Sequence, residues 1–200
     1  MILRAVLAAR PTAPRGRAGV EEARRLGRAA LEESARVSGF ELPAGTPPFP
    51  RDAERAPLPI QRTDGHGPLY WSTTNTTGLV VALVAPVPVG VDAEWLGRPR
   101  SEAVVAYVPE GERQRTGLAT PLAAFAIWSA REAVVKCAGI GMAAMGDVAL
   151  VDAPSAGPWS MRLGSALYHV RQLRDERHVV SVAARSTFEL EPHVLAEAVA

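Results

Sequence analysis

Two acidic side chains end an apolar segment, "VGVDAEW", at residues 89–95. In a β-strand, residues two apart share a face, so Asp92 and Glu94 would point in the same direction. Two carboxylates on one face are suitable ligands for Mg²⁺ when the phosphates of a substrate supply the remaining ligands. The alternative is a solvated strand end with two surface acids, and this short segment on its own favours that alternative.

A third acidic side chain precedes the only lysine of the chain by four residues, as Glu132 and Lys136 within "WSAREAVVKCAGIGM". Residues four apart share a helix face, and an ordinary surface ion pair worth a few tenths of a kcal/mol would account for the two residues alone. The flanking residues are apolar, however, which indicates a buried helix, where an unused ion pair is costly. All other basic residues are arginine, so the lysine suggests that a compact charge is needed, as beside a phosphate oxygen.

Together, the two segments resemble the signature of the Sfp-type 4′-phosphopantetheinyl transferases. The first matches the family's Gly-(Ile/Val)-Asp-x-Glu strand, and the second matches its Trp-(Ser/Thr)-x-(Lys/Arg)-Glu-Ala-x-x-Lys helix. They occur in the expected order, about forty residues apart. The paired signature is specific, although neither half is specific alone. The resemblance covers most of the chain and leaves the proline-rich region 40–60 unmatched.

The resemblance implies roles for the four charged residues in transfer of the 4′-phosphopantetheine arm of coenzyme A to a carrier-protein serine. Asp92, Glu94 and Glu132 would hold Mg²⁺ on the pyrophosphate of coenzyme A. Glu132 would also take the proton from the serine, directly or through water, and 3′,5′-ADP would leave. Lys136 would contact the phosphate in transit and neutralise the charge that builds on it.

Five further residues are implied as contacts to coenzyme A or to its phosphates. Arg131 stands where the family often has lysine, and we expect it to contact a phosphate with altered geometry. Arg28 is a candidate for the nucleotide end, with a solvated helix charge as the alternative. Asn75, beside Thr74, aligns with the family histidine that helps to hold the 3′-phosphate. Asparagine cannot carry the charge of a protonated histidine, and His66 is a candidate to compensate, with a solvated loop histidine as the alternative.

The elements that must position these residues can be predicted from hydrophobic patterning and from helix and turn signals. The strongest helix is predicted at 120–139, where Thr120 would cap the start, Pro121 suits the first turn and Gly139 would end it. Strands are predicted at 1–9, 87–95, 147–153, 159–163 and 178–184. Residues 67–85 are predicted as a strand, a polar turn and a second buried strand or short helix. Further helices are predicted at 20–39 and at the start of 101–117, loops at 10–19 and 41–59, and a helical or frayed tail at 191–200.

This mixed order of elements predicts the α+β (mixed α/β) class, with strands that are largely antiparallel because several short ones follow each other. The resemblance implies, more specifically, two similar halves related by a pseudo-two-fold axis. We take these halves as residues 1–90, on the nucleotide side, and 91–200, with the metal and catalytic motifs. Coenzyme A would lie in the cleft between them.

Composition argues against several other classes of protein. The formal net charge of +1 is too small for a nucleic-acid binder that works through a general basic field. No apolar run approaches the roughly 18 residues of a membrane span, and the first ten residues are too short, and interrupted by Arg4, for a signal-peptide core. Cys137 is the only cysteine, which fits a reducing compartment. We therefore expect a cytoplasmic protein and, from the resemblance, a monomer.

Three hypotheses for function are compatible with the sequence. The leading one is an Mg²⁺-dependent phosphopantetheinyl transferase that acts on acyl or peptidyl carrier proteins. The second is a diverged relative that keeps coenzyme A or nucleotide binding but serves as an accessory protein or catalyses another reaction. The third is a structural or interaction domain in which the motifs are coincidental, and the joint match of both motifs disfavours it.

Overall fold

The structure of the chain is a computed structural model, and it describes residues 1–10, 16–44, 49–53, 56–97 and 101–195. The helices and strands, in chain order, are β1 (Ile2–Ala9), α1 (Arg17–Val37), β2 (Tyr70–Thr76), β3 (Leu79–Ala85), β4 (Val89–Trp95), α2 (Ser101–Tyr107), α3 (Glu110–Arg115), α4 (Thr120–Ala138), the 3₁₀ helix η1 (Met142–Asp147), β5 (Val148–Asp152), β6 (Trp159–Leu163), β7 (Ala166–Arg174), β8 (His178–Ala184) and β9 (Glu189–Val194).

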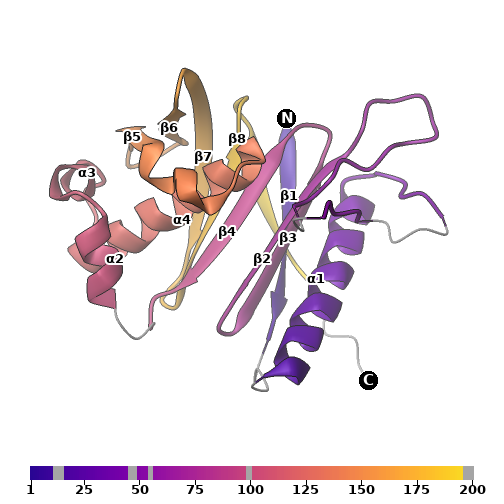
Figure 1. Cartoon of the computed structure of the whole chain (residues 1–200), viewed down its shortest axis with the longest axis horizontal. Coiled ribbons are helices and arrows are strands. Elements are labelled where there is room, and N and C mark those ends of the chain that lie inside the picture. The colour runs from indigo at the N-terminus through magenta and orange to yellow at the C-terminus, as the bar shows by residue number, and fades with distance from the viewer. Residues whose placement is uncertain (11–15, 45–48, 54–55, 98–100, 196–200) are drawn as a thin grey trace.

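The described strands form two sheets, and one long helix lies against each sheet (Figure 1). The first sheet has the order β2-β3-β1-β9, in which only the β1–β9 pair is parallel. The second sheet has the order β4-β8-β7-β6-β5 and is antiparallel throughout. The predicted α+β class with largely antiparallel strands is therefore confirmed.

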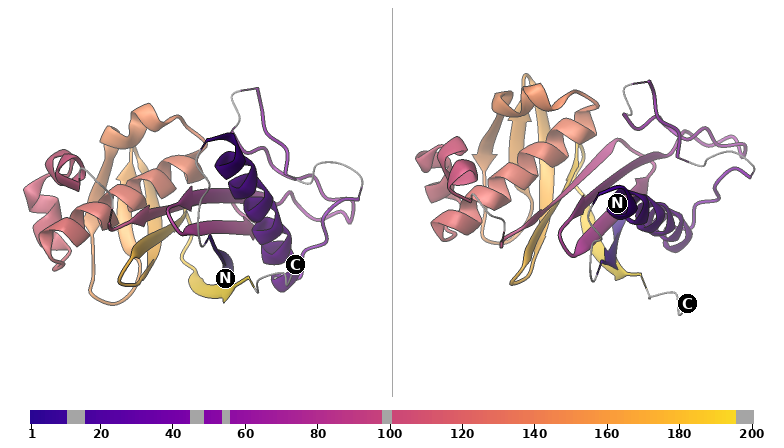
Figure 2. Two further views of the ribbon diagram at one scale, coloured as in Figure 1. Left: turned by 90° about the horizontal axis from the view of Figure 1, so that it is seen from below. Right: turned by 60° about the horizontal axis from the view of Figure 1, so that its bottom comes forward.

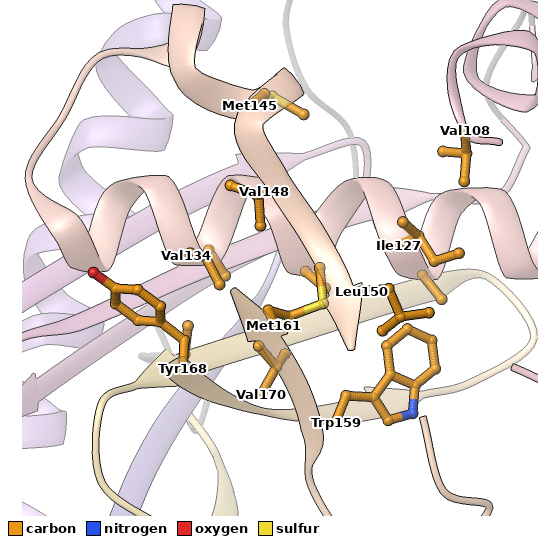
Figure 3. Close-up of a cluster of buried hydrophobic side chains, with 14 of the residues drawn as sticks. Val108, Ile127, Val134, Met145, Val148, Leu150, Trp159, Met161, Tyr168 and Val170 are labelled. Atoms are coloured by element: carbon orange, nitrogen blue, oxygen red, sulfur yellow. The ribbon is translucent and has the colours of Figure 1, made fainter. Parts of the chain in front are cut away.

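Three apolar cores hold these layers together. One packs α1 on the first sheet, through residues such as Leu31 and Val80. A second lies between the two sheets, where Val81 and Leu83 of β3 meet Val91 of β4. The third packs α4 on the second sheet, and Figure 3 shows its buried side chains between the helix and the strands. The order of the layers is consequently helix, sheet, sheet, helix.

Figure 2 shows that the remaining segments lie at opposite ends of the molecule. Helices α2 and α3 lie at one end, beside the start of α4. The described part of the connection between α1 and β2 extends at the other end, and it contains neither a helix nor a strand. This agrees with the loop predicted at 41–59, where proline disfavours regular structure.

Several sequence-based predictions need correction. The stretch 101–117 forms two helices, because α3 follows α2 after a short break. Strand β7 was missed, and residues 191–194, predicted as helical or frayed, belong to strand β9. Leu195 follows the strand, and residues 196–200 of that predicted tail lie outside the described residues. Strand β9 is mostly exposed and lacks a regular apolar pattern, so only its pairing with β1 identifies it.

The predicted limits of the long helices also differ in detail. Helix α1 begins at Arg17, inside the stretch predicted as a loop. Thr120 does not cap α4: the N-cap position is Ala119, and no side chain among the described residues caps the start of the helix. Gly139 does end α4, with a φ of 68° that favours glycine. The division of the chain at residue 90 stays a prediction. Strand β4 begins just before that residue, and β9, near the C-terminal end of the described residues, pairs with β1 in the first sheet.

Candidate active site

Alternate residues of β4 face different layers, and this places its acidic side chains under α4. Val89, Val91 and Ala93 enter the core between the sheets. The residues between them therefore face the opposite side, as the alternation of a strand requires. The Ser129 hydroxyl of α4 donates a hydrogen bond to the backbone oxygen of Asp92, with an O–O distance of 3.2 Å.

Gly90 explains how α4 comes so close to β4. A Cβ atom at this position would lie 1.9 Å from the backbone oxygen of Ala133 and 2.5 Å from the backbone nitrogen of Cys137. Any side chain would therefore push the helix away from the strand. The glycine of the strand motif is needed because the helix backbone occupies the space where a Cβ would be.

Three carboxylates meet where the strand and the helix face each other. One oxygen each of Asp92, Glu94 and Glu132 can be chosen such that all three lie within 4.8 Å of one another. Asp92 and Glu94 are buried, and Glu132 is partly buried. The prediction that Asp92 and Glu94 share a face is confirmed geometrically, and only the tertiary structure adds the helix glutamate to them.

The single lysine lies against the same cluster. The Lys136 ammonium donates a hydrogen bond to Asp92 Oδ1 at 2.7 Å and another to the Val91 backbone oxygen at 3.2 Å. It lies 3.7 Å from Glu132 Oε2. Its side chain is 28% exposed, so the charge of Lys136 is accessible to a ligand that approaches the carboxylates.

Trp128 was not singled out as a site residue from the sequence, yet it contacts the cluster directly. Its indole nitrogen donates a hydrogen bond to Glu132 Oε1 at 2.8 Å. The ring of Tyr107, from α2, packs edge-on against the indole with centroids 4.9 Å apart. The signal in the sequence was the spacing of four between Trp128 and Glu132, which puts both on one face of a helix.

Burial and the proximity of the other carboxylates alter the protonation of Glu132. Burial raises the pKa of Glu132 to about 7, and the negative charges of Asp92 and Glu94 act in the same direction, while Lys136 opposes them. The charge of Lys136 thus does not offset the combined effect of burial and the two neighbouring carboxylates on Glu132. A divalent cation would supply the missing positive charge and favour the ionised form of every carboxylate.

The donor set fits a hard cation such as Mg²⁺. Asp92 Oδ2 is buried and has no hydrogen-bond partner among the described residues. A buried carboxylate oxygen without a partner is costly, and a cation would satisfy it. Carboxylate oxygens are the ligands that Mg²⁺ prefers in proteins. Asp92, Glu94 and Glu132 are therefore the residues that would hold such an ion.

The adjacent thiol is not a candidate nucleophile. Cys137 follows Lys136 in α4, and its sulfur donates a hydrogen bond to the Pro88 backbone oxygen at 3.3 Å. Burial raises the pKa of the Cys137 thiol to about 12. The thiolate required for nucleophilic attack is therefore scarce at neutral pH.

The other residues predicted as coenzyme A contacts do not all lie at the cluster. Thr74 does, because its hydroxyl donates to Asp92 Oδ1 at 3.2 Å. Asn75 is exposed and belongs to the other face of β2. That face of β2 is turned toward helix α1. The hydroxyl of Thr73, which shares the face with Asn75, lies 3.4 Å from the position that a Cβ atom on Gly27 of α1 would occupy. The neighbours Thr74 and Asn75 therefore cannot serve one ligand group from the same side.

Arg131 also points elsewhere. It is buried, pairs with Glu112 of α3 at 2.9 Å, and lies over the ring of Tyr107. The prediction that Arg131 contacts a phosphate therefore finds no support in its placement. Arg28 and His66 are exposed, on α1 and in the loop before β2. No hydrogen bond or ion pair joins either of them to the carboxylate cluster within the described part of the chain.

Comparison with known proteins agrees with this geometry. The family model of the 4′-phosphopantetheinyl transferase superfamily matches residues 88–183. The matched region contains β4, α4 and the whole carboxylate cluster. No curated protein matches the chain, and no helix among the described residues is both long and apolar enough to cross a membrane. Residues 88–183 of this chain are therefore a domain of the 4′-phosphopantetheinyl transferase superfamily.

Proposed function

We propose that the chain transfers the 4′-phosphopantetheine arm of coenzyme A to a serine of an acyl or peptidyl carrier protein, in an Mg²⁺-dependent reaction that releases 3′,5′-ADP. One observation carries this proposal: a superfamily domain holds three carboxylates within 4.8 Å, one with an unpartnered buried oxygen, directly beside the only lysine of the chain. A solvated strand end, the alternative for this segment, would not bury Asp92 and Glu94.

The proposed reaction is attack of the serine hydroxyl on the β-phosphorus of coenzyme A. A bond forms between the serine oxygen and this phosphorus, and the bond from the phosphorus to the bridging oxygen breaks. The electron pair leaves with 3′,5′-ADP. Glu132 accepts the serine proton, directly or through water, and its orientation is fixed by the hydrogen bond from Trp128.

Two kinds of positive charge balance the phosphates in this proposal. Mg²⁺, held by Asp92, Glu94 and Glu132, would polarise the phosphate oxygens. Lys136 would provide a second, compact positive charge to the phosphate in transit. The ammonium of Lys136 is held in place by hydrogen bonds to Asp92 and to the Val91 backbone oxygen. Because it is already positioned, little reorganisation is needed when charge develops.

The second candidate is a diverged relative with the same fold that binds coenzyme A or a nucleotide without transferring the arm. Asn75 in place of the family histidine and the pairing of Arg131 with Glu112 favour it, because both weaken the expected grip on phosphates. The intact carboxylate cluster and Lys136 favour transfer. The cytoplasmic location and the monomeric state stay predictions.

Mass spectrometry of a carrier protein tests the proposal directly. We expect an apo carrier protein incubated with the chain, coenzyme A and Mg²⁺ to gain the mass of one phosphopantetheine arm on its serine. Omission of Mg²⁺ in the presence of a chelator should abolish the gain. Binding of coenzyme A without any gain on several carrier proteins would contradict transfer and favour the diverged relative.

Replacement of Lys136 by arginine tests whether a compact charge is needed. We expect Lys136→Arg to lower kcat at least about tenfold, equivalent to roughly 1.4 kcal/mol of lost transition-state stabilisation. The reason is that a broad, planar guanidinium cannot occupy the position of an ammonium between Asp92 and the Val91 backbone. Steady-state kinetics measures the effect, and thermal unfolding shows whether the variant is folded. Wild-type kcat would make Lys136 an ordinary helix-face residue.

Asn75 leads to a prediction about the choice of donor substrate. A neutral amide can donate a hydrogen bond to the 3′-phosphate, but it lacks the ion–ion attraction that a protonated imidazole adds. We therefore expect kcat/KM for coenzyme A and for 3′-dephospho-coenzyme A to differ by less than about tenfold. A thousandfold preference for coenzyme A would contradict this and indicate that another residue, such as Arg28 or His66, binds the 3′-phosphate.

The reverse exchange at the same position provides the matched variant. Asn75→His should improve kcat/KM for coenzyme A more than for the dephospho form. The improvement should be larger at pH 6 than at pH 8, because imidazole carries its charge below its ordinary pKa near 6.5. Since Asn75 is exposed, the substitution should leave the thermal stability of the chain unchanged.

A further inference from the structure

The edge strands of the two sheets are joined by side-chain hydroxyl groups. Strand β2 ends the first sheet and β4 ends the second. Ser72 Oγ accepts a hydrogen bond from the backbone nitrogen of Val91 at 3.0 Å, and Thr74 Oγ1 donates one to Asp92 Oδ1 at 3.2 Å. We call Ser72 and Thr74 the hydroxyl seam. The seam ties the first sheet to the residues that carry the carboxylate cluster.

The two oxygens of Asp92 are in different situations. Oδ1 accepts hydrogen bonds from Lys136 at 2.7 Å and from Thr74 at 3.2 Å. Oδ2 has no partner among the described residues, although the side chain is only 4% exposed. The two donors come from different layers of the fold, α4 and the first sheet. Together they restrict rotation of the carboxylate and leave Oδ2 as the oxygen that a cation would bind.

We propose that Thr74 is a positioning residue for the metal carboxylate Asp92, so that the affinity of the site for a divalent cation depends on the first sheet. This inference rests on the proposed function, because it assumes that Asp92 is a metal ligand. A threonine hydroxyl has one proton to donate. While that proton is shared with Asp92, Thr74 cannot donate it to a phosphate of coenzyme A, so a positioning role replaces the phosphate contact that the sequence suggested.

The effect should be seen in metal affinity before it is seen in substrate affinity. Residues that orient a metal ligand through a hydrogen bond change affinity for the metal about ten- to hundredfold when they are replaced. In a Thr74→Val variant the volume of the side chain is kept and the donor is lost. Among the described residues, Lys136 would then be the only donor on Asp92 Oδ1, and the carboxylate could rotate about its terminal bond.

The chain offers a close control at the neighbouring residue. Thr73 lies on the opposite face of β2, and its hydroxyl donates to the Val81 backbone oxygen at 3.2 Å, away from the cluster. Thr73→Val therefore removes a threonine hydroxyl from the same strand without touching Asp92. Thr74→Ser keeps the donor and loses only a methyl group. Thermal unfolding of all variants separates loss of metal affinity from loss of the fold.

The experiment is a titration of the whole chain with Mn²⁺, followed by the electron paramagnetic resonance signal of the free ion, with coenzyme A present and no carrier protein. We expect the wild type and Thr73→Val to bind with the same Kd, Thr74→Val to bind about ten- to hundredfold more weakly, and Thr74→Ser to return to within about threefold of the wild type. Asp92→Asn serves as the variant without a metal ligand.

The outcomes distinguish the inference from the function on which it rests. If Thr74→Val binds Mn²⁺ as tightly as the wild type while Asp92→Asn does not, the positioning role is wrong and the metal site stands. If Asp92→Asn also binds as tightly as the wild type, both the metal site and the positioning role are wrong. Failure of Thr74→Ser to restore binding would show that the methyl group, and thus packing, is what matters.

Discussion

Replacement of Glu132 by glutamine is expected to lower kcat/KM for transfer at least about a hundredfold, because one substitution removes both a proton acceptor and a ligand to the cation. Glutamine has the same shape, so the hydrogen bond from Trp128 to the side-chain oxygen can be kept. The loss would therefore report the missing charge and basicity. Asp92→Ala should have an effect of similar size, since Asp92 is the most buried member of the cluster.

Steady-state transfer to one carrier protein at saturating Mg²⁺ measures this effect. Glu102→Gln is the matched control, because Glu102 is exposed in the first turn of α2 and is no part of the cluster. The control should behave as the wild type. If Glu132→Gln kept near-normal turnover with Mg²⁺ present, both roles assigned to Glu132 would be wrong.

Introduction of a single methyl group at Gly90 is expected to be the most damaging change outside the charged residues. The new Cβ would lie 1.9 Å from the Ala133 backbone oxygen, a distance at which backbone atoms must move. Overpacking of a core typically costs about 1–3 kcal/mol, and a clash with helix backbone belongs at the upper end or beyond it. We therefore expect Gly90→Ala to lower the free energy of unfolding by about 3 kcal/mol or more.

The same change should also impair transfer in the molecules that remain folded. Helix α4 would have to move away from β4, which separates Glu132 and Lys136 from Asp92. Thermal or denaturant unfolding measures the first effect and steady-state kinetics the second. At about 2–4 °C for each kcal/mol in a chain of this size, the melting temperature should fall by at least about 6 °C.

Gly141→Ala is the matched control for this substitution. Gly141 has an extended backbone with φ of −69°, and no atom of the described part of the chain lies within 4 Å of the position of a Cβ atom, its chain neighbours aside. Alanine should be tolerated there, or should stabilise the chain slightly by restricting the unfolded state. Equal stability of the Gly90 and Gly141 variants would contradict the close approach of α4 to β4.

The members of the carboxylate cluster and the adjacent lysine were all named from the sequence as candidates. The alternation of a strand placed Asp92 and Glu94 on one face, and the helical spacing of four placed Lys136 beside Glu132. Both relations are local, because they depend only on the geometry of one element. The limits of α4 and its end at Gly139 were local too, and they were predicted within a residue or two.

Only the tertiary structure decided which of the candidates meet. Arg131 and Glu132 are neighbours in sequence, yet one pairs with α3 and the other joins the cluster. Thr74 and Asn75 are neighbours as well, and β2 turns them to opposite faces. Their roles depend on which element packs on each face, and a pattern within one element does not contain that information.

The same reason accounts for what the sequence left out. Strand β9 is defined by its pairing with β1 across most of the length of the chain, and the hydroxyl seam exists because two edge strands happen to lie together. The glycine of "VGVDAEW" is evident in the sequence, but the sequence does not reveal why a glycine is required there. A missing side chain signals a close approach only when the approaching backbone, here that of α4 at Ala133, is in place.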